Sequence, residues 1–106
     1  MTHTTQQFIA HWARSHADCI LDLLIVGSQA AADEGCPAAP GSDVDLLVIT
    51  RQGTDPGELM QGLAEAGLRS QVLFHPLIMT KAEWEEKNDM PLYRRMVLGG
   101  RRVPTR

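Results

Sequence analysis

The chain has 106 residues, 43% of them hydrophobic, with a formal net charge of −3 at pH 7 and a pI near 5.7. This length and apolar content predict one domain, residues 1–106, built around a single core. The acidic balance argues against the strongly basic surface typical of nucleic-acid binding, and no apolar run is long enough to predict a membrane span.

The first predicted elements are a helix over about residues 5–17 and a strand over residues 20–26. In the helix, apolar residues recur at three- and four-residue spacing, which predicts one face turned toward the core. In the strand, a nearly continuous apolar run predicts burial. The helix face is formed by Phe8, Ile9, Trp12 and His16.

The predicted strand ends at Gly27-Ser28, and three alanines follow at positions 30–32. Alanine favours helix and Ser28 is a good N-cap, so a helix is expected to begin here. The N–H groups of a helix N-terminus bind anions, the serine hydroxyl adds a donor, and Gly27 allows close approach of a phosphate. A turn glycine followed by a capping serine would explain the same residues without a ligand.

A second strand is predicted over residues 43–49, beginning with the two carboxylates Asp43 and Asp45. Two residues apart on an extended segment, these carboxylates leave the same face roughly 6.5 Å apart and can share a cation. Both faces of the strand are otherwise apolar, which predicts cover on both sides. Poor solvation of two like charges calls for a compensating cation or proton, and among cations Mg²⁺ prefers carboxylate oxygens. The alternative is a pair of aspartates in a solvated loop.

A crossover helix is predicted from the cap at Asp55 to about Gly67, with Glu58 completing a capping box. The third strand, residues 72–80, should then run parallel to the second and bring its early residues toward the aspartate pair. One of these early residues is His75, followed by a proline. An imidazole can act as a base or bind a metal, and it can equally be a structural histidine at a sheet edge.

Two short helices are predicted at the end of the sequence, over residues 81–87 and 91–98, the second closed by Gly99-Gly100. Together the elements predict an α/β (α+β) fold, a small mixed β-sheet of three or more strands with flanking helices. The apolar stripe of the last helix consists of Leu92, Tyr93, Met96 and Val97.

The combination of Gly27-Ser28, a loop and the Asp43-x-Asp45 strand resembles the minimal nucleotidyltransferases of the DNA polymerase beta superfamily. The resemblance implies the polymerase beta-like fold, a nucleoside triphosphate held at the Gly-Ser element, and Mg²⁺ (or Mn²⁺) held by the aspartates. The residues that it marks are Gly27, Ser28, Gln29 and Ser42 for nucleotide binding, Asp43 and Asp45 for the metal, and Asp43, Asp45 and His75 for catalysis.

The sequence departs from this family pattern at three places. The loop over residues 29–42 is longer than usual, and Gln29 stands where an arginine is frequent. The third carboxylate of the family is missing, because the sequence has no acidic residue between Glu65 and Glu83 and His75 takes its aligned position.

Three functional hypotheses follow. The first is an enzyme that transfers a nucleoside monophosphate, most simply AMP from ATP, to a hydroxyl of a protein or small molecule. The second is a weakly active or inactive nucleotide- or partner-binding module, such as the antitoxin of a small helical toxin of the HEPN class. The third is an α/β domain in which the motif is a relic.

The expected surroundings are those of a cytoplasmic protein with reduced thiols. Cys19 and Cys36 fit no metal-ligand spacing. The expected partners are a nucleoside triphosphate and a small helical protein or a second copy of the chain, without membrane or nucleic acid.

Overall fold

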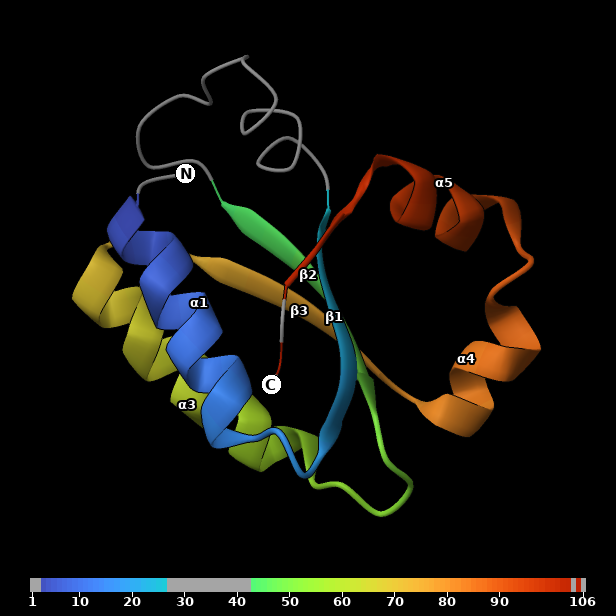
Figure 1. Ribbon diagram of the computed structural model, residues 1–106, viewed down its shortest axis with the longest axis horizontal. Helices are drawn as coiled ribbons and strands as arrows, with labels where there is room; N and C mark the ends of the chain where they lie inside the picture. Colours follow the sequence, from blue (N-terminus) through green and yellow to red (C-terminus); the bar gives the residue numbers. More distant parts are fainter. Residues whose placement is uncertain (1–2, 27–42, 104, 106) are drawn as a thin grey trace.

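The computed structural model describes residues 3–26, 43–103 and 105 and shows a four-stranded sheet with helices on both faces (Figure 1). The strand order is β3-β2-β1-β4, with β1 antiparallel to β2 and to β4, and β2 parallel to β3. The predicted mixed sheet with flanking helices is therefore confirmed. Its elements are α1 (His3–Ser15), β1 (Ile20–Val26), β2 (Val44–Thr50), α3 (Pro56–Ser70), β3 (Phe74–Thr80), α4 (Lys81–Lys87), α5 (Pro91–Gly99) and β4 (Arg101–Arg102).

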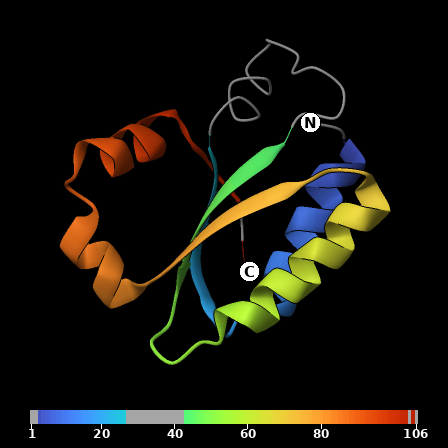
Figure 2. The same cartoon turned by 180° about the vertical axis from the view of Figure 1, so that it is seen from behind.

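Strand β2 is covered on both faces, as its sequence predicts. Val44, Leu46 and Val48 belong to the core under α1 and α3, and Leu47 and Ile49 belong to the core under α4 and α5. Figures 1 and 2 show the two helix pairs on opposite sides of the sheet. Because strand side chains alternate between faces, every odd-numbered residue of β2 points toward α4 and α5.

Strand β1 contains one irregularity near its start. Ile20 pairs with Thr50 and Asp22 with Ile49, so Leu21 is an extra residue in the ladder, a β-bulge. The bulge lets Ile20 join the same core as Leu23 while Leu21 stays 38% exposed.

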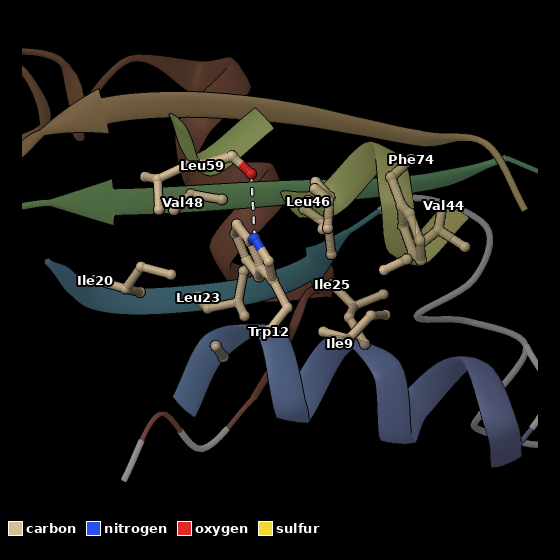
Figure 3. Packing of buried hydrophobic residues seen from close by; sticks show 13 residues of the cluster. Ile9, Trp12, Ile20, Leu23, Ile25, Val44, Leu46, Val48, Leu59 and Phe74 are labelled. Carbon is tan, nitrogen blue, oxygen red and sulfur yellow. Dashed lines mark hydrogen bonds between the residues drawn. The ribbon is translucent and has the colours of Figure 1, made fainter. Parts of the chain in front are cut away.

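The larger core joins α1 and α3 to the sheet, and Trp12 lies at its centre (Figure 3). The Trp12 indole is 5% exposed, and its Nε1–H donates to the Leu59 carbonyl at 3.1 Å. This bond satisfies the one polar group of the indole and fixes α1 against α3. The first helix ends at Ser15, two residues before the expected end, and His16 lies in the following turn, where its ring is 5.8 Å from that of Trp12.

Helix α3 begins where the sequence predicts and ends later. Asp55 caps it by accepting a bond from Gly57 N–H at 2.9 Å, and the expected capping box with Glu58 is not formed. The predicted end at Gly67 is wrong by three residues, because the chain turns only at Gln71, which has φ 57°. At Gly67 a side chain is excluded, since a Cβ would lie 2.6 Å from the carbonyl of Val72.

Among the described residues, none of the helices combines the length and the apolar character that a membrane span requires.

The capping box is found instead at α4, whose bounds match the prediction. The Thr80 hydroxyl accepts from Glu83 N–H, and the Glu83 carboxylate accepts from Thr80 N–H, both at 3.2 Å. The hydrogen bond from the Thr80 backbone N–H is the main cause that lowers the pKa of Glu83 below its ordinary value, and the hydrogen bond from the Thr80 hydroxyl is the second. Helix α4 is thereby anchored to the end of β3.

The apolar stripe predicted for the last helix is divided in the structure. Tyr93 and Met96 pack on the smaller core, and Tyr93 meets Trp84 edge to face at 5.8 Å between ring centroids. Leu92 and Val97 are 54% and 41% exposed, so two of the four residues of the stripe remain accessible. The helix is a short cover held by two side chains.

Strand β4, which the sequence did not predict, returns the chain to β1. Val103 N–H donates to the Leu23 carbonyl at 2.8 Å. The Arg102 guanidinium forms a bidentate ion pair with the Asp22 carboxylate: Nε lies 3.0 Å from Oδ1, and Nη2 donates to Oδ2 at 3.1 Å. Such a two-pronged pair adds directional specificity and holds this short strand on the edge of the sheet.

We predict that Trp12→Phe lowers the free energy of unfolding by about 1–3 kcal/mol, because the shorter ring leaves a gap and the bond to Leu59 is lost. Urea denaturation followed by circular dichroism measures the change. Leu68→Ala is the matched control: Leu68 is 82% exposed, and its loss should cost less than about 0.5 kcal/mol. Equal effects of the two changes would contradict this account of the core.

Candidate functional site

The candidate site lies where β1 ends and β2 and β3 begin. Val26 pairs with Asp45 across the antiparallel ladder, and Asp45 pairs with His75 across the parallel one. Register partners on neighbouring strands share a face, so these three side chains form a row on the α4 and α5 side of the sheet. The parallel pairing expected from the crossover helix is confirmed, and it brings His75 beside the aspartates.

A hydrogen bond joins the two most exposed members of the site. His75 Nε2 lies 2.9 Å from Asp43 Oδ2, and the side chains are 50% and 53% exposed. An ionised carboxylate only accepts, so Nε2 carries the hydrogen. In the neutral ring Nδ1 then has a free lone pair, which can accept a proton or a metal ion.

Asp45 lies deeper than Asp43. It is half-buried, and its carboxylate makes no hydrogen bond or ion pair with another described residue. It lines a cavity of about 250 Å³ at the end of the sheet, together with His75. The remaining walls of this cavity are apolar: Val26, Leu46, Leu77 and Met96.

None of these four wall residues was identified from the sequence as part of a site. Leu77 follows His75 on the same face of β3, a relation that period-two alternation could have revealed. Met96 comes from α5, and only the three-dimensional placement of that helix brings it to the cavity.

The expectation that both aspartates are poorly solvated is wrong for Asp43. This residue precedes β2, and about half of its side chain remains accessible. Its hydrogen bond with His75 is exposed, and exposed polar pairs of this kind contribute about 0–1 kcal/mol. The site therefore does not hold two buried like charges.

The donor chemistry of the site suits a hard divalent cation that is shared with a ligand. Asp43 and Asp45 offer carboxylate oxygens and His75 an imidazole nitrogen. Among the described residues, no group of three or more histidine, cysteine or acidic side chains is arranged to hold a metal by itself. Mg²⁺ is usually bound by one or two carboxylates, with water and substrate phosphates completing its shell, so the aspartate pair fits that partial role.

The four residues expected to bind nucleotide, Gly27, Ser28, Gln29 and Ser42, lie outside the described residues, as does Cys36. The helix expected after Ser28 lies there as well. Cys19 is half-buried as a free thiol in the turn between α1 and β1.

Comparisons of the chain with protein-family models, with curated proteins and with solved structures found no match. The site is therefore interpreted from its own residues.

Gly100 fixes the position of α5 above the site. A Cβ at Gly100 would lie 2.5 Å from the carbonyl of Met96 and 3.2 Å from both the carbonyl of Ile25 and the side chain of Val26. The backbone after α5 can therefore approach β1 only without a side chain at this position. This close approach keeps Met96 on the wall of the cavity.

We predict that Gly100→Ala destabilises the fold by about 1–3 kcal/mol, because the added Cβ would clash with the Met96 carbonyl and crowd β1, so the end of α5 must shift. The neighbouring Gly99 is the control: a Cβ there meets nothing within 4 Å, so Gly99→Ala should be neutral or slightly stabilising. Thermal unfolding reports stability, and the methyl resonance of Met96 reports its place in the cavity. Displacement of that resonance by both substitutions alike would contradict the assigned role of Gly100.

Proposed function

We propose that the chain is a nucleotidyltransferase-like protein that binds a nucleoside triphosphate with Mg²⁺ or Mn²⁺ at the end of its sheet. The observation that carries this proposal is that Asp43, Asp45 and His75 lie together at one end of the sheet. His75 is the register partner of Asp45, and its Nε2 lies 2.9 Å from Asp43 Oδ2. The proposal is further supported by the sequence motif over residues 27–45, whose resemblance to the polymerase beta superfamily implies a phosphate-binding element at Gly27-Ser28.

In this proposal Asp43 and Asp45 hold the divalent ion together with the phosphates of the nucleotide. The bound ion would stabilise negative charge at the transferred phosphoryl group. Val26, Leu77 and Met96 form an apolar wall against the non-phosphate part of the nucleotide. Their contribution would be to exclude water and to position the ligand.

The reaction would join an acceptor hydroxyl to the α-phosphorus and release pyrophosphate. The hydroxyl oxygen forms the new bond to phosphorus as the bond to the β-phosphate oxygen breaks. His75 Nδ1 would take the proton of the hydroxyl while Nε2–H keeps its bond to Asp43. The acceptor is a protein or a small molecule, and we place the protein in the cytoplasm, where ATP and Mg²⁺ are abundant.

We predict that the chain binds ATP in the presence of Mg²⁺ and that Asp45→Asn weakens this binding at least tenfold, which corresponds to about 1.4 kcal/mol. The reason is that Asp45 is the deeper of the two proposed ligands. Isothermal titration calorimetry with and without Mg²⁺, using ATP, GTP, CTP and UTP, measures the effect.

Asp89→Asn is the control, because Asp89 lies in the turn between α4 and α5 and is exposed. It removes the same charge from the chain without touching the proposed site. Affinity that is independent of metal, or equally reduced by both substitutions, would remove the support for the aspartate pair as a metal site.

A second candidate function is a binding module that does not catalyse a reaction, and it is favoured by the presence of His75 on β3. The family resemblance aligns His75 with the third carboxylate of the superfamily, and in the structure its Nε2 lies within hydrogen-bond distance of Asp43. The partner proposed from the family resemblance is a small helical protein of the HEPN class, and a toxin–antitoxin pair is the corresponding biological setting.

For this second candidate we predict that the chain copurifies with such a helical protein encoded beside its gene. The double variant Asp43→Asn/Asp45→Asn should retain the complex, because docking does not require the metal ligands. Mass spectrometry of the partner distinguishes the two functions: an added 5′-monophosphate with the wild type, absent with the variant, indicates catalysis. A complex that the variant abolishes would contradict the binding-module hypothesis.

A further inference from the structure

A second hollow, of about 690 Å³, lies at the opposite end of the sheet from the candidate site. It is found where the parallel strands β2 and β3 end: Thr50 and Thr80 are register partners, so Arg51 and Lys81 leave the sheet side by side. Thr50 lies five positions after Asp45 along the strand, a distance of roughly 16 Å. We call this the basic hollow; it is lined by Leu21, Arg51, Gln52, Lys81, Ala82 and Glu85.

The charges of the basic hollow are incompletely compensated within the described part of the chain. The Arg51 guanidinium makes no hydrogen bond or ion pair with another described residue. Lys81 Nζ lies 3.9 Å from Glu85 Oε1, and both side chains are about two-thirds exposed, so this pair contributes little. Two cations on adjacent strand ends repel each other, and an anion bound between them would relieve that repulsion.

The topology favours the same place for a ligand. Strands β2 and β3 with the intervening α3 form a parallel crossover unit, and ligands of such units bind outside the carboxyl ends of the strands. The guanidinium of Arg51 can bind two oxygens of one phosphate while Lys81 binds a third, and the amide of Gln52 adds a donor.

The apolar residues that line the basic hollow indicate that its ligand carries an organic group beside the phosphate. The bulge of β1 places Leu21, 38% exposed, in the wall, and Ala82 adds a second apolar surface. The volume falls in the range of small-molecule sites, about 300–1,000 Å³, which is more than a phosphate ion fills. We propose that the basic hollow binds a phosphate monoester, whose phosphate meets Arg51 and Lys81 and whose organic part covers Leu21.

The test is an NMR titration of the ¹⁵N-labelled chain at low salt, without divalent metal, first with inorganic phosphate and then with phenyl phosphate. We expect saturable shifts of the Gln52, Lys81 and Ala82 amides, and several-fold tighter binding of phenyl phosphate. Arg51→Gln should weaken the binding of phenyl phosphate at least fivefold. Glu85→Gln should strengthen it about twofold, because a competing carboxylate is removed.

Two controls separate this site from general attraction and from the proposed nucleotide site. Arg94→Gln removes an exposed arginine of α5, and Asp45→Asn changes the other end of the sheet, so both should leave phenyl phosphate affinity unchanged. Shifts spread over all exposed arginines, or affinity that Arg51→Gln does not reduce, would overturn the proposal. The proposed phosphate monoester site does not depend on whether ATP binds near Asp45.

Discussion

The parallel pairing of β2 with β3 is the constraint on which both proposed sites depend. Because β2 is buried on both faces, a slip of one residue would exchange Leu46 and Leu47 between two cores of different shape, and this fixes the register. The same ladder places His75 beside Asp45 at one end and Lys81 beside Arg51 at the other. The chemistry at the two ends of the sheet therefore follows from how its central strand is packed.

The parts of this arrangement that sequence reasoning predicted are those encoded locally. The apolar runs give β1 and β2 their limits, and the Thr80–Glu83 spacing marks the start of α4 because the capping box needs only four consecutive residues. The parallel direction of β3 also follows from the sequence, since a connection that contains a 15-residue helix is long enough for a crossover. From that direction alone, His75 could be expected near the aspartates.

The parts that were missed depend on contacts between distant residues. The Arg102–Asp22 pair spans 80 positions, and a two-residue strand such as β4 has no periodicity to detect. The helix turns at Gln71 and not at Gly67. Gly67 is required because the Val72 carbonyl lies too close for a side chain there, and not because the helix ends at it. The exposure of Asp43 was misjudged for a related reason: burial of a strand does not extend to the residue before it.

The exposure of Asp43 changes the reasoning about why the acidic pair is present. Two buried like charges would themselves have required a cation, whereas an exposed Asp43–His75 pair contributes at most about 1 kcal/mol. The fold is held by its two apolar cores, by the Trp12–Leu59 hydrogen bond and by the Arg102–Asp22 ion pair, none of which includes Asp43, Asp45 or His75. Stability therefore gives no reason for two carboxylates and an imidazole to lie beside an apolar cavity, which is why we propose that they bind a ligand.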